Sequence, residues 1–453
     1  MKQPHEDERI YILSEEKPAR AVIHFGVPLI AGMFVMVLYN LTDTYFIGLM
    51  RDDYQLAAVN LAYPIMMVTI ALSNIVGTGA SSLIARSIGA GDNDKAEHTL
   101  TSGWVLTLIN SAVIAGLGLL LLDPLVRLLG AGNHTFLYTK QYAAILLSGS
   151  FFTMANYTFG QLLRSEGSVR YSIAGMIIGT AFNIVFDPIF IFTLHLGIRG
   201  AAAATVLGNL AGALVSVYFY MAGKTLLKPG LKYLKPTGEI LREIFKIGIP
   251  SSLETLLTSG AYVVNNNLAA SYGELTVAAM GVAQKLLSLG SYIYQGYAAG
   301  IQPLMGYNCG AGNYKRMRDI LKSGILVSSG TELAVMAVYG IFAPQLIALF
   351  TDSNEVIAIG TKVLRTLIWI LPFVGAVSMS RTTFQAMGKP KYAFGITLIR
   401  QLFLYVPLLL VLNRIFGFNG MIWAQPLTEL IMMIASVTLL LNVLKASEEH
   451  PVI

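Results

Sequence analysis

The stretch Asn183-Ile184-Val185-Phe186-Asp187-Pro188 places an amide and a carboxylate inside an apolar run of the sequence. The run, residues 171–192, is long enough to cross a bilayer as a helix. Asn183 and Asp187 are four residues apart, so they share one face of that helix. Pro188 has no N–H, so the carbonyl of Ile184 loses its helical partner beside the acid. Such groups are costly at membrane depth, which indicates either a binding site or a polar cluster that holds helices together.

A second acid, Asp43, ends the first apolar run in the sequence Asn40-Leu41-Thr42-Asp43. We expect Asp43 and Asp187 to meet and to bind a small cation. Two neighbouring carboxyl groups in an apolar pocket can hold a proton. Alternatively, their oxygens suit Na⁺, together with neutral oxygens of Asn40, Asn183 and Thr205. The sequence leaves H⁺ and Na⁺ both open; with Na⁺ the predicted metal ligands are Asp43, Asn183, Asp187 and Thr205.

The composition predicts a polytopic membrane protein. The chain has 453 residues, of which 55% are hydrophobic and 12% are charged, whereas soluble domains carry about 25% charged residues. The single cysteine, Cys309, excludes an internal disulfide. The net charge of +6 comes from basic residues between apolar runs, which favours membrane orientation over nucleic-acid binding. Residues 1–20 are polar and lack the features of a cleavable signal.

Twelve apolar runs are predicted to be membrane-spanning helices, because a helix satisfies its own backbone in lipid. With the N-terminus inside, 22 of the 31 lysines and arginines fall in inside segments and 7 in outside segments, while Lys285 and Arg400 lie within spans. This asymmetry predicts cytoplasmic termini in an inner membrane. The predicted spans are 22–44, 56–83, 99–122, 138–158, 171–193, 200–222, 245–270, 276–306, 321–342, 358–380, 393–412 and 420–443.

The two halves of the chain repeat each other at an offset of about 220 residues. Gly26-Val27-Pro28 matches Gly248-Ile249-Pro250, and Gly89-Ala90-Gly91 matches Gly310-Ala311-Gly312. Six helices per half give two parallel lobes, the plan of alternating-access transporters with a cavity between the lobes. The predicted divisions are a cytoplasmic tail (1–20), an N-lobe (21–222), a cytoplasmic linker (223–244), a C-lobe (245–445) and a C-terminal tail (446–453).

The repeat breaks at the two acids. Asp43 falls opposite Asn265, and Asp187 falls opposite Val406, just before Pro407. The acids are therefore specific to the N-half, whereas the prolines are common to both halves. The charges inside the C-half spans are Glu254, Lys285, Glu332, Arg400 and Glu429, for which structural pairing and substrate contact both stay open. Candidates for the substrate cavity are Tyr39, Asn156, Glu254, Lys285 and Tyr292.

Other motifs give little support to enzymatic or nucleotide chemistry. The Gly-Ala-Gly loops lack the Gly-Lys-Ser/Thr ending of a phosphate-binding loop. The six histidines never pair four residues apart, so neither a zinc site nor a hydrolytic triad is indicated. We therefore expect no enzymatic activity and no cofactor other than the coupling ion.

The twelve spans, the two halves and the motifs around Asp43 and Asp187 resemble the multidrug and toxic compound extrusion (MATE) family. The resemblance implies an antiporter that exports organic cations, dyes and drugs in exchange for H⁺ or Na⁺. By this resemblance, the cation-binding residues are expected to be Asp43, Asn183, Asp187 and Thr205. Glu254 lies earlier in its helix than the glutamate that other branches use for Na⁺ in the C-lobe, so a cation site there is not assigned.

The expected partners are the lipid bilayer and small amphipathic or cationic drugs and dyes, without nucleic acid or nucleotide, and the chain is expected to act as a monomer. The alternative is a flippase for lipid-linked oligosaccharides on a related two-lobed fold. Such a flippase needs a strongly basic cavity for a diphosphate, and the spans offer only Lys285 and Arg400 against several acids.

Overall fold

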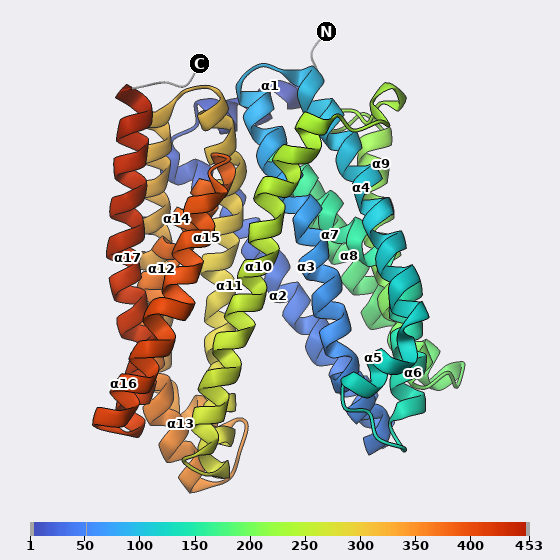
Figure 1. Cartoon of the computed structure of the whole chain (residues 1–453), viewed down its shortest axis with the longest axis vertical. Helices are drawn as coiled ribbons and strands as arrows, with labels where there is room; N and C mark the ends of the chain where they lie inside the picture. Colours follow the sequence, from blue (N-terminus) through green and yellow to red (C-terminus); the bar gives the residue numbers. More distant parts are fainter. Residues whose placement is uncertain (1–3, 51, 450–453) are drawn as a thin grey trace. The chain divides into compact units, whose positions relative to one another are not determined.

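The described part of the chain consists of helices joined by short connections (Figure 1). The computed structural model describes residues 4–50 and 52–449, and no strand occurs in those ranges. The helices are α1 Pro4–Ser14, α2 Pro18–Leu49, α3 Asp53–Gly89, α4 Asn93–Leu120, α5 Leu122–Leu128, α6 Phe136–Ser148, α7 Ser150–Ser165, α8 Val169–Pro188, η1 Ile189–Thr193, α9 Ile198–Met221, η2 Leu231–Tyr233, α10 Gly238–Ala270, α11 Glu274–Gly310, α12 Tyr314–Ala348, α13 Asn354–Leu367, η3 Ile368–Ile370, α14 Leu371–Ala386, α15 Pro390–Leu398, η4 Ile399–Tyr405, α16 Val406–Phe416 and α17 Phe418–Glu449.

The predicted all-α membrane fold is confirmed. Over the residues that the structure describes, nine helical segments are long and apolar enough to cross a membrane. Two further predicted spans correspond to α10 and α11, which are long enough but carry more polar residues. The predicted span 138–158 is divided between α6 and α7, which meet at Gly149. A side chain at Gly149 would lie 2.3 Å from Cγ1 of Val206, so glycine permits this close packing.

The segments predicted as an N-terminal tail and a linker contain ordered helix. Residues 1–20 include α1, whose end is held by side chains of the C-half. Nδ2 of Asn308 donates to the carbonyl of Leu13 (2.9 Å), and Nη2 of Arg316 donates to the carbonyl of Glu16 (2.7 Å). In the predicted linker 223–244, α10 already begins at Gly238.

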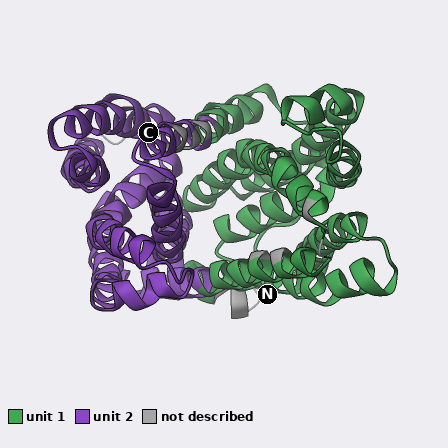
Figure 2. Ribbon diagram, turned by 90° about the horizontal axis from the view of Figure 1, so that it is seen from below, with its two compact units in different colours: residues 1–10, 31–252 green, residues 11–30, 253–453 purple. Residues whose placement is uncertain are grey.

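The chain forms two compact units, shown in different colours in Figure 2. Unit 1 comprises residues 1–10 and 31–252, and unit 2 comprises residues 11–30 and 253–453. The predicted lobes differ from these units at two segments: residues 21–30 of the predicted N-lobe belong to unit 2, and residues 245–252 of the predicted C-lobe belong to unit 1. Each boundary lies two residues after a repeated proline, Pro28 in α2 and Pro250 in α10. The first helix of each half therefore contributes to both units.

Glycines at matching repeat positions allow these exchanged segments to pack closely. In unit 1, a Cβ atom on Gly248 of α10 would lie 1.8 Å from the carbonyl oxygen of Ile75 in α3. In unit 2, a Cβ atom on Gly300 of α11 would lie 2.9 Å from the backbone nitrogen of Gly26 in α2. Small residues let helices approach this closely in membranes.

The repeated prolines of the fifth helices lie beside π-helical turns in both units. In unit 1, η1 follows Pro188 directly; in unit 2, η4 ends at Tyr405, two residues before Pro407. A wider π turn leaves backbone groups without their usual partners, and such turns often accompany functional sites. The π-helical turn beside the proline is therefore present in both halves, whereas the acid Asp187 is present only in the N-half.

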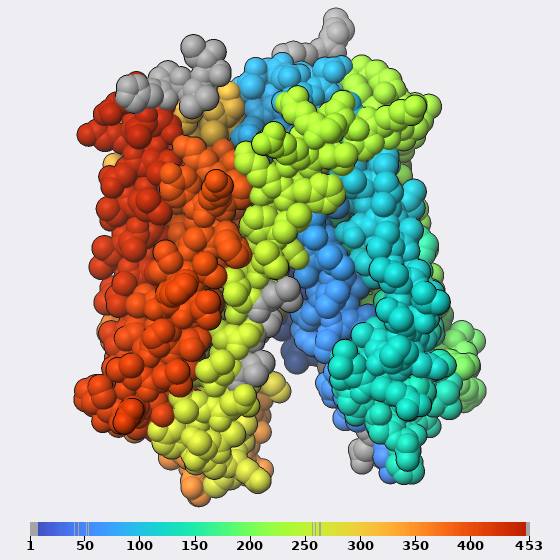
Figure 3. Space-filling model, in the orientation of Figure 1, coloured from blue at the N-terminus to red at the C-terminus, as the bar shows by residue number. Residues whose placement is uncertain are grey.

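Apolar side chains lie on the outside of the last helices of unit 2, whose α15, α16 and α17 run along the face drawn in Figure 3. Exposed apolar surface of this extent suits contact with lipid rather than water. In η4 and α16 these exposed residues are Ile399, Leu402, Phe403, Leu410, Val411, Ile415 and Phe416.

A buried carboxyl group fixes the connection that follows α9. Glu166 lies in the turn between α7 and α8, is fully buried, and accepts a hydrogen bond from the backbone N–H of Leu227 (2.9 Å). Burial raises the pKa of Glu166 to about 7, although the hydrogen bonds from Leu227 and Ser168 and the positive charge of Arg9 oppose that shift. The folded protein therefore holds a proton here that the unfolded chain releases at lower pH.

This carboxyl group predicts a pH-dependent stability. Between the ordinary pKa of 4.5 and about 7, the folded state binds one proton more than the unfolded state, so the free energy of unfolding should fall as pH rises. We expect thermal unfolding in detergent to show this fall for the wild type and a flatter profile for Glu166→Gln. The control is Glu274→Gln, which alters an exposed carboxylate. Parallel profiles for the wild type and Glu166→Gln would contradict the prediction.

Candidate cation-binding site

Two glycine pairs bring α8 and α9 together next to the predicted site. Gly175 and Gly179 of α8 face Gly212 and Gly208 of α9, respectively. A Cβ atom on Gly179 would lie 2.7 Å from the carbonyl oxygen of Gly208, and a Cβ atom on Gly175 would lie 3.0 Å from that of Gly212. Each helix carries the Gly-x-x-x-Gly spacing that places both glycines on one face. The same face of α8 carries Asn183 one turn further on.

This packing places Asn183 between Asp187 and Thr205. Asn183 and Thr205 are 2% and 6% exposed, and Asp187 is fully buried. One orientation of the Asn183 amide satisfies both of its ends: Nδ2 donates to Oδ2 of Asp187 (3.0 Å), and Oδ1 accepts from the backbone N–H of Thr205 (3.1 Å). We assign this orientation because the opposite one leaves contacts of 3.4 and 3.5 Å.

Asp43 joins this cluster from α2. Its carboxyl group is hydrogen-bonded to the carboxyl group of Asp187. A hydrogen bond between two carboxyl groups needs a proton on one of them, because ionised carboxylates only accept. Oδ1 of Asp43 is buried and has no hydrogen-bond partner among the described residues. The pair can therefore hold one proton and still offer a free acceptor oxygen.

Two predicted substrate-cavity residues lie beside the same cluster. The hydroxyl of Tyr39 lies 3.4 Å from Oγ1 of Thr205. Nδ2 of Asn156 donates to Oδ1 of Asn209 (3.0 Å), whose own amide donates to the carbonyl of Thr205 (2.9 Å). The sequence interpretation missed Asn209, although its spacing of four residues from Thr205 places both on one face of α9.

The donor set fits a proton or a hard monovalent cation. Carboxylate, amide and hydroxyl oxygens favour such ions over soft metals. Among the described residues, no group of three or more histidine, cysteine, aspartate or glutamate residues could hold a metal ion. Asn40 was also predicted here, and its side chain lies outside the described residues.

Three of the five charged residues of the C-half spans, Glu254, Arg400 and Glu429, form ion pairs within unit 2. Nη1 of Arg381 donates to Oε2 of Glu254 (2.9 Å), and Gln385 donates to the same oxygen (3.2 Å). Nε of Arg400 donates to Oε1 of Glu429 (2.8 Å). These contacts favour structural pairing for Glu254, Arg400 and Glu429.

The other C-half candidates differ in their surroundings. Glu332 is fully buried in α12 and accepts a hydrogen bond from the backbone N–H of Tyr294 (3.0 Å). In α11, Lys285 is exposed and Tyr292 is half-buried. Roles for Glu254, Lys285 and Tyr292 in a substrate cavity stay predictions.

The Arg400–Glu429 pair can be tested through stability. Arg400→Met should leave the carboxylate of Glu429, whose side chain is 1% exposed, without its cation, at a cost of about 3 kcal/mol. We expect a lower midpoint of thermal unfolding in detergent. The double variant Arg400→Met/Glu429→Gln should recover most of the loss because the uncompensated charge is gone. An unchanged midpoint for Arg400→Met would rule out structural pairing.

Comparisons with known proteins agree with the internal repeat. A family model described as MatE matches twice, over residues 28–189 and 250–411. Each match covers most of one half of the chain. The repeated unit found in the sequence is thus the unit that the family model describes.

Similar proteins cover nearly the whole chain. The multidrug export protein MepA of Staphylococcus aureus (strain MSSA476) is 30% identical over 425 residues, which is 93% of each chain. The protein of the same name from Staphylococcus haemolyticus (strain JCSC1435) is 31% identical over 425 residues, with the same coverage of both chains. A crystal structure of MATE in complex with MaD3S is 30% identical, with a TM-score of 0.93, and the match covers 99% of this chain and 100% of that one.

Proposed function

Because the chain belongs to the MatE family, we propose that it is a multidrug efflux transporter driven by a proton gradient. It is a multi-pass membrane protein and a transporter rather than an enzyme. The coupling site of this proposal comprises Asp43, Asn183, Asp187 and Thr205. The observation that carries it is the hydrogen bond between the carboxyl groups of Asp43 and Asp187.

The proposed mechanism exchanges a proton for a drug by alternating access. A proton entering from outside is held between Asp43 and Asp187, where Asn183 donates to Asp187 and orients it. When the site faces the cytoplasm, loss of the proton leaves two like charges close together, which favours a different arrangement. Coupling requires that proton and substrate bind the two arrangements with different affinities.

The proposal also covers the substrates and the orientation of the chain in the membrane. The substrates are amphipathic, mainly cationic, organic compounds, and the chain acts as a monomer in an inner membrane with cytoplasmic termini. Tyr39 and Asn156 adjoin the coupling site and would line the path of the substrate. The oligosaccharide-flippase alternative is not favoured, since the similar curated proteins are multidrug exporters.

The test is ethidium transport in proteoliposomes with known protein orientation. Proton and Na⁺ gradients are imposed separately on the wild type and on Asp43→Asn. We expect transport with the proton gradient, little with the Na⁺ gradient, and loss of proton-driven transport in Asp43→Asn.

Transport driven by Na⁺ alone would overturn proton coupling while leaving export intact. Ethidium movement without any gradient requirement would overturn antiport. Retention of gradient-driven transport in correctly folded Asp43→Asn would remove the coupling role of that residue.

A further inference from the structure

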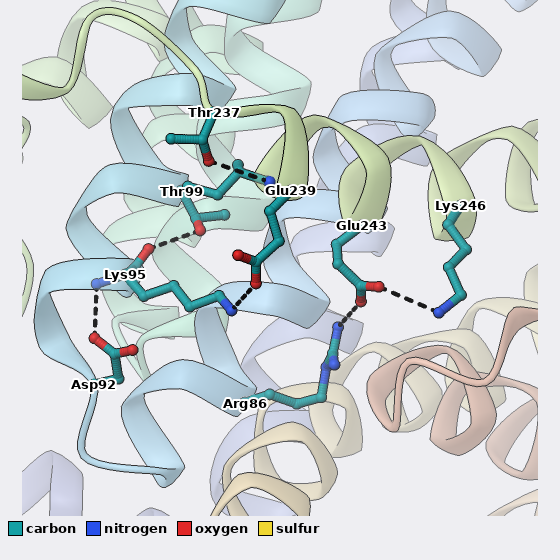
Figure 4. A network of polar contacts seen from close by, with 9 residues as sticks. Arg86, Asp92, Lys95, Thr99, Thr237, Glu239, Glu243 and Lys246 are labelled. Atoms are coloured by element: carbon teal, nitrogen blue, oxygen red, sulfur yellow. Dashed lines mark hydrogen bonds and ion pairs between the residues drawn. The ribbon is translucent and has the colours of Figure 1, made fainter.

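A charged cavity of about 450 Å³ lies at one end of unit 1, away from the site of Asp43. Three helix ends form it: the last turns of α3, the first turn of α4 and the first turns of α10. Figure 4 shows the polar contacts around it. The residues that line it are Leu83, Arg86, Lys95, Glu239, Arg242, Glu243 and Lys246.

The cavity has an excess of positive charge. Four of its side chains are cationic and two are carboxylates, so two positive charges remain unbalanced. The helices α4 and α10 both begin here, and their positive ends add to the field. Their first turns already have caps, since Oδ1 of Asp92 accepts from the backbone N–H of Lys95 (2.9 Å) and Oγ1 of Thr237 accepts from that of Ile240 (3.4 Å). The side chains are therefore the donors available to a ligand.

The two carboxylates do not occupy all of these cations. Glu243 accepts from Nη2 of Arg86 (3.2 Å) and from Nζ of Lys246 (3.2 Å), which uses both of its oxygens. Glu239 pairs with Nζ of Lys95 (2.6 Å). Arg242 is exposed and makes no ion pair with any carboxylate among the described residues.

Glu243 stays ionised in this setting. Burial of the carboxyl group opposes ionisation, and the charges and hydrogen bonds of Arg86 and Lys246 outweigh it, so the pKa of Glu243 is lowered. The Arg86–Glu243 ion pair is half-buried, with the two side chains 21% and 23% exposed. The Lys95–Glu239 contact is weaker because the Glu239 side chain is 70% exposed. A ligand that competes for cations would take Lys95 before Arg86.

We propose that this cavity binds the phosphodiester head group of an anionic phospholipid. Arg242 presents the planar donor fork that suits phosphate oxygens, while Lys246 and Lys95 add point charges beside it. Helix α3 ends here and helix α4 begins here, and both are long and apolar enough to span a membrane, which places the cavity at head-group level. Basic pockets of this kind between helices bind anionic lipid head groups on the cytoplasmic side. Lipid binding at this cavity is a property separate from drug export, and it does not depend on which ion drives transport.

The lining argues against a nucleotide as the occupant. The side chains around the cavity include no aromatic residue, so a base would find no stacking surface. Leu83 is the single apolar residue in the lining, and it is buried. A lipid head group and free inorganic phosphate offer the same phosphate oxygens, so the experiment below must distinguish these two ligands.

The experiment measures lipid retention and thermal stability of the full chain. Purified protein is reconstituted in nanodiscs of phosphatidylcholine alone or with phosphatidylglycerol, and retained lipid is counted by native mass spectrometry. The cavity variant is Arg242→Gln/Lys246→Gln. The matched control is Arg170→Gln/Lys228→Gln, which removes the same charge at exposed positions outside the cavity. A third variant, Glu239→Gln, removes a carboxylate from the cavity.

We expect the wild type to retain phosphatidylglycerol selectively and to unfold at a higher temperature in its presence. Retention should fall about 30-fold in the cavity variant, since each of the two basic residues contributes about fivefold. The control should resemble the wild type, and Glu239→Gln should retain more lipid.

Equal losses in the cavity variant and the control would overturn the site in favour of diffuse surface attraction. Stabilisation by inorganic phosphate in lipid-free detergent, without a further effect of phosphatidylglycerol, would overturn the lipid assignment. Reduced retention in Glu239→Gln would also contradict the proposal, because removal of a competing carboxylate must favour an anion.

Discussion

Asp187→Asn should lower the initial rate of gradient-driven efflux about 100-fold, near the upper range of coupling free energies between sites. Asparagine nearly preserves the shape of the side chain but cannot exchange a proton near neutral pH. The buried cluster with Asn183 and Thr205 should therefore remain folded, while the hydrogen bond that shares a proton with Asp43 is replaced by one without an exchangeable charge. The measurement is ethidium efflux from proteoliposomes at matched protein content.

A matched control separates coupling from general loss of charge. Asp123→Asn removes a carboxylate whose side chain is 55% exposed and that pairs with Lys140 (2.6 Å). We expect near-normal efflux for this variant, because exposed ion pairs contribute little. If Asp187→Asn transports as fast as Asp123→Asn at equal expression, Asp187 has no coupling role.

Gly248→Ala should have the largest effect on folding. Its Cβ atom would lie 1.8 Å from the carbonyl oxygen of Ile75, and the contact is with backbone, so α10 must move away from α3. Overpacking of this kind costs about 3 kcal/mol or more. We expect little monodisperse protein in detergent and a much lower midpoint of thermal unfolding for whatever is recovered.

The same helix supplies the control. Gly260 of α10 has nothing within 4 Å of its Cβ position, so Gly260→Ala should be neutral or slightly stabilising through helix propensity. Gly26→Ala should fall between the two, because its Cβ atom would meet the ring of Tyr297 rather than backbone. Equal yields for Gly248→Ala and Gly260→Ala would contradict the close packing of α10 against α3.

Much of the architecture could be predicted because it depends on composition and periodicity. Long apolar runs must be helical in lipid, and the repeat of Gly26-Val27-Pro28 as Gly248-Ile249-Pro250 predicted the two halves that the family model matches separately. Asn183 and Asp187 were predicted to share a face from their spacing alone. Thr205 lies in another helix, so the sequence could name it only as one possible neutral ligand, and it gained most from the resemblance.

What the sequence did not provide is the register between helices. The glycine spacing in α8 and α9 is visible, but which glycines meet depends on three-dimensional packing, and that packing places Asn183 beside Thr205. Opposite charges in the C-half allowed several pairings, and only the fold selects Arg400 with Glu429 and Arg381 with Glu254. The exchange of residues 21–30 and 245–252 between the two lobes runs against chain order, so no local pattern indicates it.

That exchange also constrains how the protein is made on the ribosome. Residues 238–252 of unit 1 are translated only after the entire first half, so unit 1 is unfinished when its own six helices have been inserted. Residues 11–30 are made early but must wait for their partners in unit 2. The amide of Asn308, which donates to the carbonyl of Leu13, is synthesised 295 residues later. Neither unit can mature before the other half begins to emerge, so insertion is sequential while final packing is concerted.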